Sequence, residues 1–72
     1  MTAEEALLTY YKNSHQSQPE LAIALNVSQT TIHNWLSGKN KIPIDYYVVI
    51  SRLSEVDLVS LLPEEWKRSL AK

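Results

Sequence analysis

Cysteine and phenylalanine are absent from this 72-residue chain, and glycine occurs once. Without cysteine, neither a disulfide nor a thiolate-bound metal can stabilise the fold. A single glycine is too few for a glycine-rich loop that cradles phosphates. Apolar runs are short, and the first ten residues, MTAEEALLTY, are acidic where a secretion signal is basic. We therefore expect a cytoplasmic protein with no membrane-spanning segment.

Catalytic and metal-binding patterns are equally scarce. The two histidines, His15 and His33, lie far apart, and neither has a second ligand at the spacing of a metal site. No serine or acidic pair has partners at the spacing of a catalytic motif. The sequence therefore predicts a protein that is not an enzyme and that needs no metal or cofactor.

The charge balance gives little sign of an anionic partner. The length suits one domain, the composition is that of a globular chain, and the net charge is −1, whereas nucleic-acid-binding domains are usually basic. The distribution is uneven, because no acidic residue lies between Glu20 and Asp45, where Lys39 and Lys41 are found. These lysines either form a local positive face or simply solvate a loop.

The centre of the chain, residues 17–38, reads SQPELAIALNVSQTTIHNWLSG and predicts two short helices. Ser17 and Glu20 have the spacing of a capping box, so the first helix should begin near Gln18, with Pro19 tolerated in its first turn. One apolar stripe at helical spacing should face the core. It consists of Leu21, Ala22 and Leu25.

Asn26 is the expected corner between these helices. Asparagine adopts the left-handed conformation at low cost, so Asn26 can end one helix and turn the chain, with Val27 filling the corner. Ser28 is a natural N-cap for the second helix, and Gly38 should end it. The side chains at inward-facing spacing are Ile32, Trp35 and Leu36.

The outward side of the second helix carries neutral hydrogen-bonding side chains. They are Gln29, Thr30, His33 and Asn34. Amides and hydroxyls at the exposed start of a helix can donate to and accept from base edges in a major groove. The competing interpretation makes His33 an ordinary surface residue, and the spacing of Trp35 places it in the core rather than against a base.

Three further helices are expected, over residues 3–12, from Pro43 or Ile44 to about Leu53, and over residues 58–62. Thr2 with Glu5 should cap the first, and Asp57 the last. β-Branched residues are dense around residues 46–50, so a strand is the rival there; no second strand-like run could pair with it, which favours helix.

Core assignments follow from helical spacing in the second half of the chain. The side chains expected to face inward are Tyr46, Ile50 and Leu53, with Tyr47, Val48 and Val49 on the other side. The tail after Leu62 is expected to be helical or frayed. Trp66 should fold back onto the core, the alternative being that it anchors a partner.

Eight positions of the central stretch resemble the helix-turn-helix pattern of phage-type repressors. They are Gln18, Leu21, Ala22, Leu25, Asn26 (where glycine is usual), Val27, Ile32 and Trp35. Two later runs, Ile42-Pro43 followed by Tyr46 and Ile50, and LLPEEW at residues 61–66, are similar to the tail of small prophage Cro proteins and YdaS-type antitoxin regulators. The similarity spans residues 5–66.

This resemblance implies an all-α, five-helix helix-turn-helix domain of the phage repressor/Cro (lambda repressor-like) type. The domain would span residues 1–66, with its helix-turn-helix unit at 18–37 and a tail at 67–72. It would bind operator DNA and regulate transcription, as a Cro-like repressor of prophage origin that occludes a promoter. The expected base readers are Gln29, Thr30, His33 and Asn34. The expected phosphate contacts are Gln18, Ser28, Thr31, Lys39 and Lys41.

The expected partner is double-stranded DNA with an approximately palindromic site, bound by a homodimer. The alternative is that the chain is a helical protein-interaction module, such as an antitoxin that binds a toxin or another protein. Such a module would use exposed apolar side chains. The candidates are Tyr10, Val49, Val59, Trp66 and Leu70.

Overall fold

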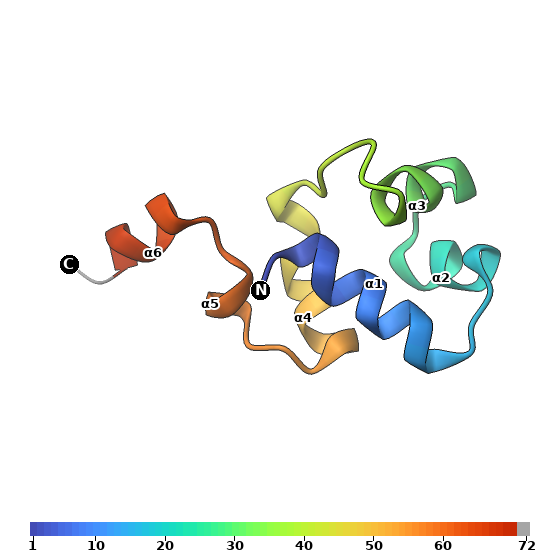
Figure 1. The fold of residues 1–72 in the computed structure, drawn as a ribbon, viewed down its shortest axis with the longest axis horizontal. Coiled ribbons are helices and arrows are strands. Elements are labelled where there is room, and N and C mark those ends of the chain that lie inside the picture. Colours follow the sequence, from blue (N-terminus) through green and yellow to red (C-terminus); the bar gives the residue numbers. More distant parts are fainter. Residues whose placement is uncertain (71–72) are drawn as a thin grey trace.

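The computed structural model describes residues 1–70, and within them the chain forms six α-helices and one 3-10 helix (Figure 1). The elements in chain order are α1 (Ala3–Ser14), α2 (Gln18–Leu25), α3 (Gln29–Leu36), η1 (Ile44–Tyr46), α4 (Tyr47–Ser54), α5 (Leu58–Leu61) and α6 (Glu64–Leu70). The all-helical class is confirmed. The count of five helices is wrong, because residues after Pro63 form α6, and the helix expected from Pro43 or Ile44 starts with a 3-10 turn.

Both expected capping boxes are present. The hydroxyl of Thr2 accepts from the Glu5 backbone N–H at 3.1 Å, and the Glu5 carboxylate accepts from the Thr2 backbone N–H at 3.1 Å. Ser17 and Glu20 make the same exchange at the start of α2. The backbone N–H of each capping residue lowers the pKa of the paired glutamate below its usual value. Asp57 is the N-cap residue of α5, as predicted, but its side chain makes no hydrogen bond to the backbone of the first turn.

The corner between α2 and α3 lies at Asn26, as predicted. Asn26 has φ 58° and ψ 45°, which is the left-handed region, and its backbone N–H donates to the Ile23 carbonyl at 3.1 Å. Val27 follows, half-buried against the core, and its N–H donates to the Ala22 carbonyl at 3.0 Å. Gly38, with φ 81°, comes directly after the last turn of α3.

Among the described residues, one core joins α1 to α5. The buried side chains are Ala3, Ala6, Leu7, Leu21, Ala22, Leu25, Ile32, Trp35, Ile42, Tyr47, Ile50 and Leu61. α1 packs chiefly against α4, while α2 and α3 pack on each other. The predicted inner faces of α2 and α3 are confirmed, since Trp35 is 5% exposed and Ile32 is fully buried.

The burial of Tyr46 and Tyr47 differs from the prediction made from helical spacing. Tyr47, expected on the outer side, is buried, whereas Tyr46 is half-buried and lies edge-on to Trp35 with ring centroids 5.1 Å apart. The 3-10 turn causes the change, because η1 advances the chain by a different angle per residue than an α-helix. Inward facing of Ile50 and half-burial of Leu53 agree with the prediction.

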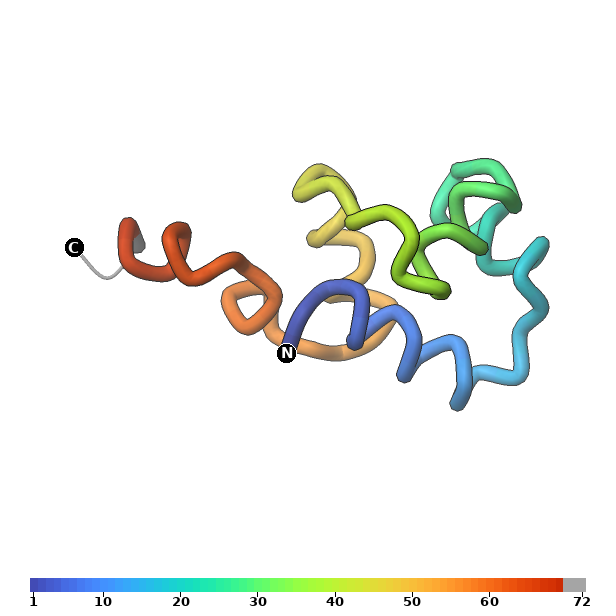
Figure 2. Tube along the Cα trace, turned by 45° about the horizontal axis from the view of Figure 1, so that its top comes forward, coloured from blue at the N-terminus to red at the C-terminus, as the bar shows by residue number. Residues whose placement is uncertain are grey.

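α6 projects from the end of the molecule opposite α2 and α3, and it extends the longest dimension to 40 Å (Figures 1 and 2). The expectation that Trp66 folds back onto the core is wrong, because this side chain is 50% exposed. Pro63 separates α6 from α5 and so turns the helix away from the body. The Leu70 side chain and residues 71–72 lie outside the described part. None of the described helices is long and apolar enough to cross a bilayer.

Candidate nucleic-acid interface

The first turn of α3 and the start of α2 form one exposed polar surface. Gln29, Thr30 and His33 are exposed on α3, and the half-buried Gln18 of α2 lies beside them. Together the four side chains line a shallow hollow of about 280 Å³. The sequence assigned Gln18 to phosphate contact and the other three to base reading, and the structure brings all four together.

Ser28 and Thr31 hold the start of α3. The Ser28 hydroxyl accepts from the Thr31 backbone N–H at 3.1 Å and lies 2.8 Å from the Thr31 hydroxyl. The predicted N-cap is therefore confirmed. Both hydroxyls lie at the edge of the polar surface, but each already has a partner in the other. A hydroxyl can make more than one hydrogen bond, so a phosphate oxygen could accept from whichever of the two hydroxyls does not donate to the other.

Asn34 does not join the residues that line the hollow. Its side chain is half-buried one turn further along α3, and its backbone carbonyl accepts from the Asn40 N–H at 3.2 Å and the Ser37 hydroxyl at 3.3 Å. These bonds tie the end of α3 to the loop that follows it. The four expected base readers thus divide into three residues on one surface and Asn34 at its margin.

Lys39 and Lys41 are exposed in that loop, but Lys41 borders a different hollow. This second hollow, of about 410 Å³, lies between the start of α1, the loop and the base of α6, and it is also lined by Glu4, Tyr47 and Lys67. The backbone N–H of Ile42 donates to the Glu4 carboxylate at 2.7 Å, which fixes the loop against α1. No local sequence pattern signalled Glu4 or Lys67 as neighbours of Lys41.

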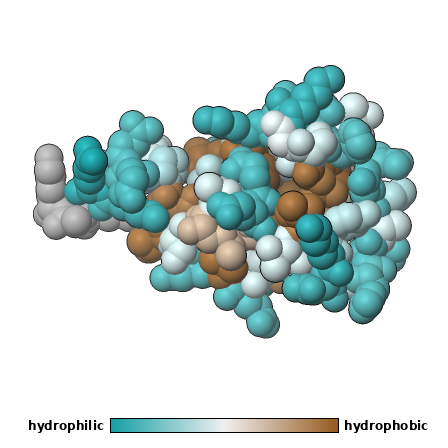
Figure 3. Space-filling model, viewed as in Figure 1, coloured by the Kyte–Doolittle hydropathy of each residue, from teal (hydrophilic) through white to brown (hydrophobic). Residues whose placement is uncertain are grey.

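The surface properties differ between the two ends of the molecule. Hydrophilic residues predominate over the end formed by α2 and α3, whereas hydrophobic surface appears where α6 meets the body (Figure 3). No acidic residue occurs between Glu20 and Asp45, so the first turn of α3 and the loop after it carry no negative side chain of their own. The first turn of α3 and the loop after it are therefore polar without being acidic, whereas the first turn of α2 carries the exposed Glu20.

Comparison with protein families assigns the chain to a family. A family model described as "Bacterial toxin YdaS" matches residues 14–69, which is most of the chain. The chain belongs to the YdaS family. The match begins at the last residue of α1 and extends through α2, α3, η1, α4 and α5 into α6. The polar surface and the projecting helix with Trp66 thus both lie inside the family region.

The family assignment agrees with one of the two resemblances drawn from the sequence, that to YdaS-type proteins. It characterises the chain as a small helical protein of a toxin-associated family. Comparison with curated proteins and with solved structures gave no significant match.

Proposed function

We propose that this YdaS-family chain binds operator DNA sequence-specifically and regulates transcription, as a Cro-like repressor that occludes a promoter. The observation that carries the proposal is the grouping of Gln18, Gln29, Thr30 and His33 around one exposed hollow. The packing of α2 against α3 supports the proposal, because a helix-turn-helix protein would read bases with the start of the second of its two helices.

Base reading would centre on the first turn of α3. Glutamine can pair in bidentate fashion with N6 and N7 of adenine, and Gln29 is the first residue of the helix, just beyond the Ser28 cap. Thr30 and His33 supply further hydrogen-bonding groups on the same face. Asn34 would reach bases from the margin of that face after a side-chain rotation.

Phosphate contacts would flank the reading turn on both sides. Gln18 begins α2, and its side-chain amide can donate to a phosphate oxygen. The contact would be made by this side chain and not by the helix end, because the capping box of Ser17 and Glu20 already occupies the first turn of α2. Ser28 and Thr31 lie at the start of α3, and Lys39 and Lys41 lie in the loop beyond its end. Few of these contacts are cationic, so a single copy should bind weakly. Useful affinity would require two copies on half-sites about one helical turn apart, which predicts an approximate palindrome.

A second function is favoured by a different observation. Trp66 is half exposed on α6, and tryptophan is enriched at the centres of protein interfaces. The chain could therefore act as a protein-interaction module, such as an antitoxin that grips a protein partner. The exposed valines Val49 and Val59 supply further apolar surface, whereas Tyr10 is half-buried and donates to Gln16.

The experiment that separates the two functions is a gel shift of random-sequence DNA at several salt concentrations. A DNA reader should bind, and its affinity should fall steeply as salt rises, because phosphate contacts release counterions. A module that binds only proteins should show no shift at any salt concentration. Selection of bound sequences from a random pool then tests for a palindrome, and protection of one asymmetric half-site at saturation would contradict the two-copy arrangement.

A further inference from the structure

One side of α4 is left uncovered by the described part of the chain. The opposite side packs against α1, and Tyr47 and Ile50 are buried there (Figure 1). The uncovered side begins in η1 and presents four exposed side chains, which we call the α4 face: Asp45, Val48, Val49 and Arg52. Val48 is 45% exposed and Val49 is 37% exposed. Two adjacent aliphatic side chains that no neighbouring helix covers make this face a candidate contact surface.

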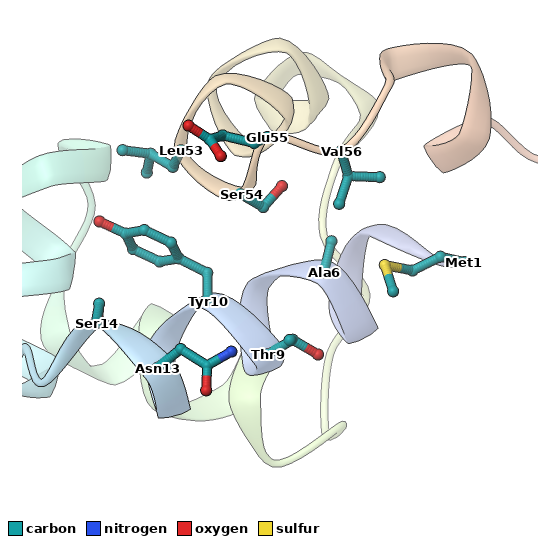
Figure 4. A pocket seen from close by; sticks show the side chains of 10 residues that line it. All are labelled: Met1, Ala6, Thr9, Tyr10, Asn13, Ser14, Leu53, Ser54, Glu55 and Val56. Carbon is teal, nitrogen blue, oxygen red and sulfur yellow. The ribbon is translucent and has the colours of Figure 1, made fainter.

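The hollow beside α4 belongs to the other side of the helix. It has a volume of about 360 Å³, lies between α1 and the end of α4, and is lined by Tyr10, Leu53 and Glu55 among others (Figure 4). No residue of the α4 face lines this hollow or either of the two hollows described above. Glu55, the carboxylate nearest to Arg52 in the sequence, thus borders the side that packs on α1. The α4 face is not hollowed, which suits packing against another helix better than binding of a small molecule.

The order of residues along the α4 face is symmetric about its centre. Asp45 lies three residues before Val48, and Arg52 lies three residues after Val49. The two charged residues are separated by about two helical turns, so they share one face with the valines between them. They are the only charged residues of η1 and α4, and their signs are opposite. Reversing the direction of the helix therefore keeps the valines at the centre and exchanges the signs of the charges at its two ends.

We propose that the α4 face packs against the α4 face of a second copy, with the two helices antiparallel about a two-fold axis. The valines of both copies meet at the centre, and each Asp45 carboxylate lies opposite the Arg52 guanidinium of the other copy. A two-fold contact requires a surface that is complementary to itself. The α4 face meets this requirement, because its negative end matches the positive end of a reversed copy. This self-complementarity is the reason for choosing a second copy as the occupant.

The charges also decide the relative direction of the two helices. A parallel pair would place Asp45 opposite Asp45 and Arg52 opposite Arg52, and like charges in contact oppose association. In the antiparallel pair both contacts join opposite charges. Val48 lies near the centre of the face, so it meets Val48 of the second copy close to the axis. A substitution at this position therefore changes both sides of the contact at the same point.

The contact should be weak in free solution. A stable interface buries about 800 Å² on each partner, whereas the α4 face offers two valines and two flanking charged residues, and exposed ion pairs contribute little. We expect association only at concentrations of about 0.1 mM or more. Two copies held on adjacent DNA half-sites would have a higher effective concentration, which would favour the same contact. The proposal does not rest on DNA binding, because the contact can be measured without DNA.

Sedimentation equilibrium of the full chain without DNA, at concentrations from about 0.01 to 1 mM, tests the contact. We expect a monomer–dimer equilibrium with no larger species, because a two-fold contact uses up the surface of both copies. Val48→Asp should weaken association at least about tenfold, since two carboxylates would meet near the axis. A monomer at every concentration, or a growing polymer, would overturn the proposal.

Ile23→Asp is the matched control for Val48→Asp. Ile23 is 80% exposed on α2 and lies outside the α4 face, so the same substitution there should leave association unchanged. Circular dichroism verifies that both variants keep the helical content of the unaltered chain. Equal weakening by the two substitutions would show that association depends on general surface charge and would overturn the proposal.

A mixing experiment tests the antiparallel pairing of the charges. Asp45→Lys would set a lysine opposite Arg52, and Arg52→Glu would set a glutamate opposite Asp45, so each variant alone should associate severalfold more weakly. In a mixed dimer the introduced lysine faces the introduced glutamate at one end, and Asp45 faces Arg52 at the other. The mixture should therefore recover most of the lost association, as a mixed dimer that native mass spectrometry identifies. Single variants that associate like the unaltered chain, or a mixture no stronger than either variant, would refute this pairing.

Discussion

Glu4 and Ile42, 38 residues apart in the sequence, are joined by a hydrogen bond of 2.7 Å from the Ile42 backbone N–H to the Glu4 carboxylate. Ile42 is buried, so without this acceptor its N–H would lose water and gain no partner. The bond ties the loop after α3 to the first turn of α1. The bond thereby fixes the position of the loop that carries Lys39 and Lys41 relative to α1.

Removing this acceptor should destabilise the fold. Glu4→Ala should lower the free energy of unfolding by about 1 to 2 kcal/mol, less than a fully buried charged hydrogen bond contributes because the pair is only half-buried. Glu4→Gln keeps an acceptor oxygen and should lose less. Urea denaturation measures both, with Glu65→Ala on exposed α6 as the control. Equal losses in Glu4→Ala and Glu65→Ala would show that the bond does not contribute.

Tyr47 should make the protein sensitive to alkaline pH. Burial, with a smaller contribution from the Glu4 carboxylate, raises the pKa of Tyr47 above its usual value of 10.0. The unfolded chain therefore loses this proton first, so the contribution of Tyr47 to stability is complete below pH 10 and declines as the pH rises toward the raised pKa. Denaturation between about pH 8 and 12 should show a smaller decline for Tyr47→Phe than for the unaltered chain. Identical declines would exclude this titration as the cause.

The corner at Asn26 gives a prediction about backbone conformation. Because Asn26 has φ 58°, Asn26→Gly should change the free energy of unfolding little. Asn26→Val should lower it by about 1 to 2 kcal/mol, since a β-branched residue resists the left-handed region. Thermal and urea unfolding of the three proteins would test this. A neutral valine substitution would mean that the corner relaxes to another conformation.

Specificity should depend on Gln29. In the proposed complex, Gln29→Ala should lose about 1 to 3 kcal/mol of binding free energy at one base position and relax the preference there, with little effect on salt dependence. Affinities for a selected site and its single-base variants measure the change. Uniform weakening across all sequences, or no change, would remove α3 from the role of reader and favour the protein-interaction function.

Lys39 should contribute affinity without specificity. It lies beyond the end of α3 and is exposed, so it reaches the backbone of DNA more readily than a base edge. Lys39→Ala should weaken all sequences about equally and reduce the slope of log affinity against log salt by about 0.9. Titrations at several salt concentrations provide the slope. A loss confined to one base position would instead make Lys39 a reader.

Local rules in the sequence determined how the helices begin and end. The boxes of Thr2 with Glu5 and of Ser17 with Glu20 form within four consecutive residues, so their bonds do not depend on the rest of the fold. The corner at Asn26 likewise depends on one residue, because asparagine adopts the left-handed conformation at low cost. Helical spacing also predicted the burial of Ile32 and Trp35, because in a regular helix the spacing alone decides which side chains share a face.

Only the tertiary structure decided how distant segments meet. The 3-10 turn of η1 exchanged the expected positions of Tyr46 and Tyr47, and the separation of α6 by Pro63 left Trp66 half exposed instead of on the core. The bond between Glu4 and Ile42 and the meeting of Gln18 with Gln29 depend on packing angles between helices. Such angles arise from many simultaneous side-chain contacts, which no short sequence pattern encodes.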